Sequence, residues 1–130
     1  LTLQIAPSDL QKVSITMDGK TTEITSADSE ALTTIANGIN NLKAFDYASY
    51  HLAAQDLANT DLTTDTRITF QADLTVNGEK KSLTIYVGTY ADPNRTYRYV
   101  QLDGSDMIMV VDNTAVLDLL NGMVPEKDLE

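Results

Sequence analysis

Three turn signals, each between two runs of alternating apolar and polar residues, constrain the fold of this 130-residue chain most strongly. They are Asp18-Gly19, Asn77-Gly78 and Asp103-Gly104. Such dipeptides accept the positive φ angles of a tight hairpin turn, and the alternation is typical of strands with one buried face. The sequence therefore predicts three β-hairpins.

Apolar residues at helical spacing follow the first and the third hairpin. The first set predicts a helix over residues 28–43, with Ser26 or Asp28 as its N-cap. The second predicts a short helix that Asn113 or Thr114 caps. Helices that follow hairpins indicate the α+β class. We expect an antiparallel β-sheet built from three hairpins, with two helices packed on one face.

The two hairpin–helix segments share an order of elements. Each has a strand, Asp-Gly, a strand, a polar cap, an apolar-faced helix and then Asn-Gly. The spacing between the glycines is 19 residues from Gly19 to Gly38 and 18 residues from Gly104 to Gly122. This order fits a degenerate hairpin–helix duplication. The alternative interpretation is that a hairpin followed by a helix is simply a common unit.

The segments between the hairpins have weaker patterns. Residues 45–50 alternate loosely and suit a strand, and residues 51–58 could form a short helix. Residues 59–66 and 88–96 are rich in Asn, Asp, Thr, Gly or Pro and are predicted to be loops.

Length and composition indicate one domain. The chain is 42% hydrophobic, which is enough for a core, and its length is near the mode for single domains. We assign residues 1–124 to a single α+β domain and residues 125–130 to a loose C-terminal tail. Because the chain starts at Leu1 rather than Met, we expect that an upstream segment has been removed.

Charge and cysteine usage exclude several classes of protein. The net charge is −10, which disfavours binding to nucleic acid or to an anionic membrane surface. Without cysteine there is no disulfide framework, thiolate metal site or catalytic thiol. No apolar run is long enough to span a membrane, so membrane association would require a missing N-terminal anchor.

Residues that could carry catalysis or bind metal form no recognisable site. His51 is the single imidazole and the first candidate for acid–base chemistry, but no nucleophile motif accompanies it. Asp56, Asp61 and Asp65 surround a polar loop and could bind calcium, although their spacing is not that of an EF-hand. Asp103 is explained as a turn residue. We therefore expect neither an enzyme nor a cofactor.

The most distinctive patch is the run from Arg95 to Tyr99. On a strand, Tyr97 and Tyr99 share one face and Arg98 lies on the other. Arginine and tyrosine are enriched at interface hot spots, so Arg95, Tyr97, Arg98 and Tyr99 are candidate partner-binding residues. The alternative interpretation is two core tyrosines with a solvated arginine.

The second half of the chain resembles a bacterial family, the domain of unknown function numbered 4340. The resemblance rests on the strand that ends at Val87-Gly88, on the Tyr97–Asp106 strand and turn, and on the strand and leucine-rich helix that follow. Asn41-Leu42-Lys43-Ala44 also looks like the section that precedes. Two departures are Asn59-Thr60-Asp61-Leu62, in place of a tyrosine–glycine–leucine motif, and Gln101, in place of an arginine.

The resemblance implies an extracytoplasmic domain at the cell surface or in the periplasm, anchored by an N-terminal lipid or membrane segment and often encoded near transport systems. It implies no catalytic residues. We therefore expect a non-enzymatic module that binds another envelope protein or assists transport. The alternatives are a small-ligand or calcium-binding domain that uses loops 56–66 and 88–96, and a hydrolase that uses His51.

Overall fold

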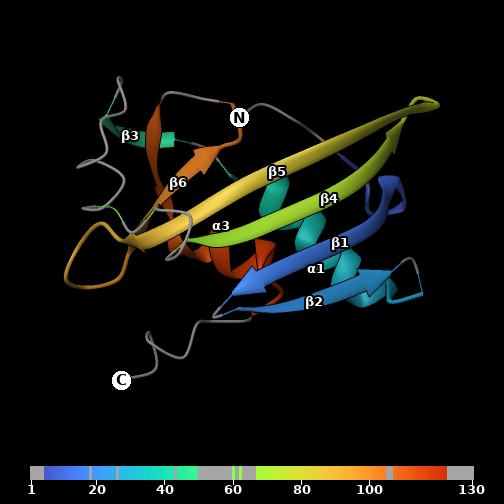
Figure 1. The fold of residues 1–130 in the computed structure, drawn as a ribbon, viewed down its shortest axis with the longest axis horizontal. Coiled ribbons are helices and arrows are strands. Elements are labelled where there is room, and N and C mark those ends of the chain that lie inside the picture. The colour runs from blue at the N-terminus through green and yellow to red at the C-terminus, as the bar shows by residue number, and fades with distance from the viewer. Residues whose placement is uncertain are drawn as a thin grey trace.

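The computed structural model describes residues 5–17, 19–25, 27–42, 44–49, 60, 62, 67–104 and 107–122, with the backbone alone for 44–49. A two-layer α+β fold is present, with a twisted sheet in front of two helices (Figure 1). Seven antiparallel strands form the sheet, in the order β2-β1-β4-β5-β6-β7-β3. The strands are β1 (Leu10–Met17), β2 (Lys20–Thr25), β3 (Ala44–Ser49), β4 (Ile68–Val76), β5 (Glu79–Tyr90), β6 (Tyr97–Leu102) and β7 (Ile108–Asp112), and a 3₁₀ turn, η1 (Pro7–Asp9), precedes them.

The predicted hairpins are confirmed. They are β1–β2, β4–β5 and β6–β7, and they lie side by side in the sheet. The strand expected near residues 45–50 is β3, which pairs with β7 at one edge. One prediction at this level was wrong: residues 88–90 belong to β5 and not to a loop. The expected helix at 51–58 and the tail at 125–130 lie outside the described residues.

Both predicted helices are present, α1 (Ser29–Asn40) and α3 (Asn113–Leu119), and they lie on the same side of the sheet (Figure 1). Asp28 caps α1, because its carboxylate accepts a bond from the Ala31 N–H at 3.2 Å. The cap of α3 is not Asn113 or Thr114, as predicted, but Asp112, whose Oδ1 accepts from the Thr114 N–H at 2.8 Å. Asp112 is the last residue of β7, so the strand leads directly into the helix.

Gly38 allows α1 and α3 to pack closely. A Cβ at Gly38 would overlap the backbone of Leu119 and approach the carbonyl of Ala115 at 2.9 Å. Asparagine and glycine are both poor helix formers, but α1 continues through Asn37 and Gly38. The glycine is therefore explained by close approach of two backbones and not by a break in the helix.

One cluster of buried side chains fills the space between the sheet and the helices. It draws on every described strand except β3, whose side chains are not described, and on both helices. Among its fully or nearly fully buried members are Val13, Ile15, Ile35, Ile39, Phe70, Ile85, Val100, Val111, Val116 and Leu119. No described helix is long and apolar enough to cross a membrane.

The two hairpin–helix units occupy related places. β2–β1 flanks the central β4–β5 hairpin on one side, and β7–β6 flanks it on the other. The pairing of Ile15 with Phe70 on one side corresponds to that of Val100 with Val87 on the other. Because all strands are antiparallel, this arrangement has an approximate two-fold axis between β4 and β5. It agrees with the placement that a duplication predicts.

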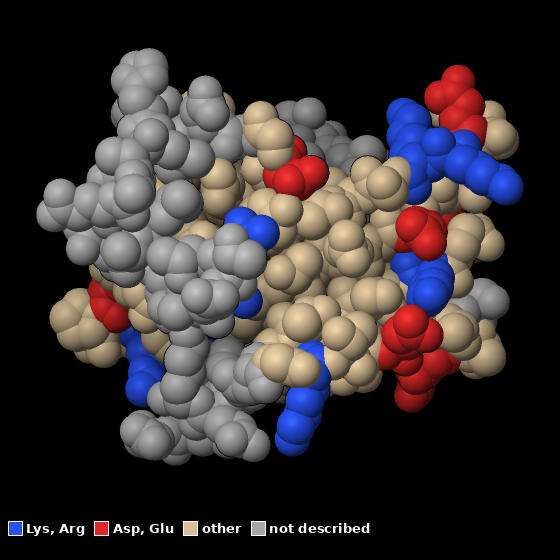
Figure 2. Space-filling model, in the orientation of Figure 1, with Lys and Arg blue, Asp and Glu red and all other residues tan. Residues whose placement is uncertain are grey.

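The face opposite the helices differs between the two halves of the sheet. Over β2, β1 and β4 it is polar, and Figure 2 shows many charged side chains along the right-hand side of the view, from the end of the β4–β5 hairpin downward. Over β5, β6 and β7 this face is more enclosed, with some side chains buried and others, such as Tyr97 and Tyr99, half-buried. Ile108 and Leu62 have 0% exposure, and Thr60 and Gln101 have 6% and 8%.

Candidate functional site

The arginine and tyrosine cluster lies where β5 and β6 approach the loop that joins them. Val87 pairs with Val100, but the next partners along the strands are Tyr90 and Arg98, so β5 contains an extra residue. This irregularity is a β-bulge, which bends a strand and redirects its groups. The Gly88 carbonyl accepts two bonds from the Arg98 guanidinium, from Nε at 3.1 Å and from Nη2 at 2.8 Å.

Arg98 is the largest fully buried side chain in the described structure, with 0% exposure. It shares the helix-covered face of β6 with Val100, which is also fully buried. Tyr97 and Tyr99 lie on the other face and are half-buried, so the predicted division of faces is confirmed. The alternative interpretation, a solvated arginine between core tyrosines, was wrong. The bulge allows Arg98 to be buried, because it places the Gly88 carbonyl where it can accept hydrogen bonds from the guanidinium inside the core.

Tyr90 joins the two arginines of the cluster. The Arg98 guanidinium lies 4.4 Å from the centre of the Tyr90 ring, and that of Arg95 lies 5.1 Å from it. Both distances are within the range of cation–π attraction. Arg95 is exposed and has a φ of 60°, an uncommon backbone conformation for a non-glycine residue. The sequence did not single out Tyr90, because it was assigned to a loop.

Asp92 holds the β5–β6 loop in shape. Its Oδ1 accepts bonds from the Thr96 N–H at 2.8 Å and the Tyr97 N–H at 2.9 Å. The bond from Tyr97 is the main cause that lowers the pKa of the Asp92 carboxyl, partial burial opposes it, and the bonds from Thr96 add to it. Further backbone bonds run from Ala91 N to Tyr97 O at 2.8 Å and from Arg95 N to Asp92 O at 3.2 Å. The loop is therefore fixed at both of its ends.

Gly88 is also contacted from the opposite face of the sheet. The Thr60 carbonyl accepts a bond from the Thr89 N–H at 2.9 Å, and a Cβ at Gly88 would overlap that carbonyl. The same Cβ would lie 3.0 Å from Leu62 Cγ. A glycine inside a strand can mark a close backbone approach, and that signal was available in the sequence. Thr60 and Leu62 come from the segment where the chain departs from the family pattern.

A second cluster of side chains lies around Tyr86, which comes before Gly88 in β5. The Arg67 guanidinium stacks 3.6 Å from the centre of the Tyr86 ring, and the Tyr86 hydroxyl donates to Asp103 Oδ1 at 2.7 Å. The bond to Asp103 is the main cause that raises the pKa of Tyr86, burial adds to it, and the charge of Arg67 opposes it. Asp103 was predicted to be a turn residue, and it also orients this tyrosine.

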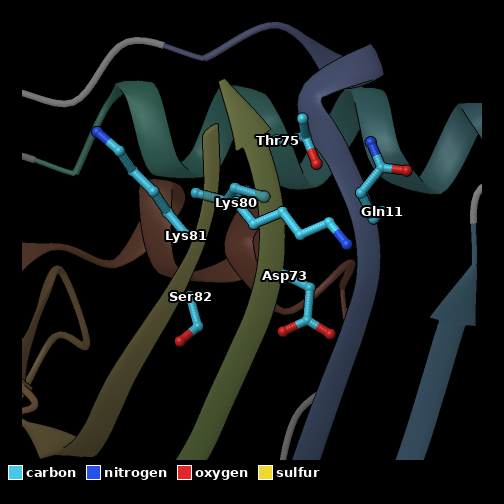
Figure 3. Close-up of a pocket in the computed structure, with 7 residues that line it drawn as sticks. Gln11, Asp73, Thr75, Lys80, Lys81 and Ser82 are labelled. Carbon is cyan, nitrogen blue, oxygen red and sulfur yellow. The ribbon is translucent and has the colours of Figure 1, made fainter. Parts of the chain in front are cut away.

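A hollow in the described surface lies toward the turn of the β4–β5 hairpin. It measures about 580 Å³ and is lined by Gln11, Asp73, Leu74, Thr75, Lys80, Lys81 and Ser82. In Figure 3 Lys80 extends across β4 toward β1, while Lys81 points away from the other side chains. A lining of one carboxylate and two lysines does not suit a metal ion.

The other candidate residues are not brought together by the described structure. No group of three or more metal-ligating side chains occurs among the described residues. His51, Asp56, Asp61 and Asp65 lie outside those residues, so their predicted roles stay predictions. Partner binding by Arg95, Tyr97 and Tyr99 likewise stays a prediction, now with a known geometry. Arg98 was predicted to contact a partner as well, but its side chain is fully buried and does not reach the surface.

Comparisons with known proteins identify the family and nothing finer. The family model described as "Domain of unknown function (DUF4340)" matches residues 20–123. The match covers most of the chain, which therefore belongs to the DUF4340 family. No curated protein and no solved structure matches the chain.

Proposed function

We propose that this domain is a non-enzymatic, extracytoplasmic module that binds another protein of the bacterial envelope. Its binding surface is the β5–β6 loop, residues 91–96, together with Tyr97 and Tyr99. Membership of DUF4340 supports the proposal only through the expectations attached to the family. The stronger support is structural: hydrogen bonds order the β5–β6 loop and hold an exposed arginine on it.

The observation that carries the proposal is a loop held rigid beneath an exposed arginine. Asp92 binds two backbone N–H groups, and Arg95 is held over the Tyr90 ring in an uncommon backbone conformation. A loop that is already ordered loses little conformational entropy when a partner binds. Arginine and tyrosine dominate binding energy at protein interfaces.

The four predicted residues take different roles in this surface. Arg95 and the exposed parts of Tyr97 and Tyr99 can touch a partner. Arg98 has 0% exposure and acts as a positioning residue, because it holds the Gly88 carbonyl and the Tyr90 ring in place. Loss of Arg98 would therefore disturb the surface from beneath.

Binding is tested with three forms of the purified domain, the wild type, Arg95→Glu and Lys81→Glu. The last makes the same charge change at an exposed residue on the remote β4–β5 hairpin. Envelope proteins that the wild type captures are identified, purified and titrated by calorimetry. We expect Arg95→Glu to weaken binding about 30-fold and Lys81→Glu to change it less than threefold. Equal binding by all three forms, or equal losses in both variants, would contradict the proposal.

The extracytoplasmic location has an independent test. Because the 130 residues contain no cysteine, Lys81→Cys provides one exposed thiol in this domain. In spheroplasts of the source bacterium, a membrane-impermeant maleimide should label this cysteine before lysis. Labelling that requires lysis would place the domain in the cytoplasm.

Among the described residues, nothing favours the ligand-binding alternative, and most of its 56–66 loop lies outside them. Within the 88–96 segment the Asp92 carboxylate already accepts two backbone N–H groups, so it is poorly available to calcium. We expect calcium at millimolar concentration to leave the melting temperature unchanged. A concentration-dependent rise would support calcium binding.

A further inference from the structure

We propose that the β2 edge of the sheet binds an extended, cationic peptide of a partner protein, which adds to the sheet as an antiparallel strand. This site is separate from the β5–β6 loop and lies on the opposite flank of the sheet. The inference rests on the edge of β2 that no described residue pairs with, on the relation of β2 to β7, and on the charge around it.

The main-chain groups that would bind the peptide can be identified from the register. Met17 pairs with Lys20 across a two-residue turn, so these two residues exchange hydrogen bonds. Alternate residues of β2 then bond to β1, and Thr21, Glu23 and Thr25 point their N–H groups away from it. The contact between the hydroxyls of Thr16 and Thr21 at 2.9 Å agrees, because side chains are closer in pairs that do not exchange bonds.

Within the described residues β2 pairs only with β1, whereas its counterpart β7 pairs on both sides. The strand that completes the β7 side is β3, which follows α1. Two related hairpins thus lie at the two flanks of one sheet. Within the part of the chain that the structure describes, the β6–β7 hairpin has an added strand and the β1–β2 hairpin has none. An open strand edge is a template for pairing, and strand addition is a common way to bind peptides.

Charge selects a cationic peptide over a second copy of the chain. Near the edge, Glu23, Asp28 and Glu30 outnumber Lys20 and Lys12, whose Nζ lies 3.2 Å from Glu23 Oε1, and the whole chain has a net charge of −10. Two copies would repel each other, whereas a cationic strand would be attracted. Glu23 already pairs with Lys12 of β1, and a Lys or Arg opposite Glu23 on the added strand would share this exposed carboxylate.

A hollow at the end of β2 strengthens the choice of a cationic partner. It measures about 510 Å³, and its lining includes Asp28, Glu30 and Thr34 but no lysine or arginine. Asp28 lies one turn beyond the strand, because its N–H donates to the Thr25 carbonyl at 3.0 Å. A basic side chain near the end of the added strand can therefore reach carboxylates without meeting a positive charge.

The probe is a library of random ten-residue peptides displayed on phage and selected on the whole 130-residue chain. Two variants locate the site. Glu23→Pro removes one outward N–H and is tolerable at a strand edge, whereas Glu23→Thr removes the charge and keeps the N–H. Circular dichroism and melting temperature establish that each variant is folded.

We expect selection of peptides that alternate in polarity and carry Lys or Arg. Their affinity should fall at least about tenfold in Glu23→Pro and about threefold or less in Glu23→Thr. If Glu23→Pro does not fold, amide hydrogen exchange in the wild type shows whether the peptide binds at the β2 edge. A saturating selected peptide should slow exchange at Thr21 and Glu23 at least about tenfold and leave Thr22 and Ile24 unchanged.

Three results would overturn the proposal. The first is a selection that yields no specific peptide. The second is peptides that bind folded Glu23→Pro as well as wild type or leave the Thr21 and Glu23 amides unaffected. The third is strong protection of these two amides in the isolated chain, since the edge would then already be covered by the chain itself. Because Arg95→Glu leaves β2 intact, it separates this site from that of the proposed function.

Discussion

The two flanks of the sheet share one architecture and differ in how completely it is covered. On the β1–β2 flank, the face away from the helices is polar and β2 has Ile24 as its single buried residue. On the β6–β7 flank, Ile108 is fully buried on that face and β3 extends the sheet. The same hairpin–helix plan thus supports an open edge on one side and an enclosed, rigid loop on the other.

One pair of corresponding residues, in the first strand of each flanking hairpin, shows the contrast between the flanks most clearly. Val13 of β1 and Arg98 of β6 occupy corresponding places, and both have 0% exposure. Val13 is accommodated by apolar packing alone. Arg98 requires a backbone acceptor, which the bulge in β5 supplies at Gly88. The enclosed flank therefore contains a buried cation where the open flank has a plain core residue.

The largest expected effect comes from removing that cation. Arg98→Ala leaves a void and an unpaired Gly88 carbonyl, and we expect the free energy of unfolding to fall by about 3–5 kcal/mol. The matched change on the open flank, Val13→Ala, should cost about 2 kcal/mol. Urea unfolding measures both. A loss below 1 kcal/mol for Arg98→Ala would mean that its burial contributes little to stability.

Gly38→Ala tests the helix packing that holds the two flanks together. In an exposed helix this change stabilises by about 1 kcal/mol. Here the new methyl group meets the Leu119 backbone, so we expect destabilisation by about 2–3 kcal/mol. Thermal unfolding of the variant gives the sign. An increase in melting temperature would show that α1 and α3 are further apart than described.

Asp92→Ala should have a smaller effect that depends on pH. The folded-state pKa of Asp92 is lowered, so its contribution to stability is present above the ordinary pKa of aspartate and is lost as pH falls through the lowered value. Wild type and Asp92→Ala should therefore differ at pH 7 and converge as the pH falls below about 4. Melting temperatures between pH 2 and pH 7 measure the difference. A difference that is constant over this range would contradict the role assigned to the carboxylate.

Tyr86→Phe is expected to have the smallest effect, about 0.5–1 kcal/mol, because it removes one exposed hydrogen bond to Asp103. The raised pKa of Tyr86 means that the contribution of this bond is present below the ordinary pKa of tyrosine and is lost as pH rises through the raised value. Spectrophotometric titration should show a tyrosine that ionises late and is absent from Tyr86→Phe. Identical titration curves for the two proteins would contradict this assignment.

The hairpins and helices could be predicted because their signals are local. Asp-Gly and Asn-Gly turns, alternation and helical spacing each specify an element within a few residues. The two errors in element boundaries, at residues 88–90 and at the cap of α3, have local causes as well. Gly88 interrupts an alternating pattern, and Asp112 ends a strand and caps a helix at once.

The burial of Arg98 could not be predicted, because it depends on groups that are distant in sequence or set by the bulge. Alternation placed its side chain opposite Tyr97 and Tyr99, but did not show which face would be covered by the helices. Gly88 appeared in the sequence as a strand end, and its contacts with Thr60 and Arg98 come from two other segments. Local patterns therefore identified Arg95, Tyr97, Arg98 and Tyr99 as candidates, but they did not show that Arg98 is the buried residue that holds the exposed ones in place.

Native-state amide hydrogen exchange tests the contrast between the flanks most directly. In the isolated chain, the account predicts fast exchange at Thr21 and Glu23 of β2, which point away from β1, and slow exchange at Met109 and Val111 of β7, which has partners on both sides. Comparable protection of the two pairs would contradict the account, because the flanks would then be equally covered.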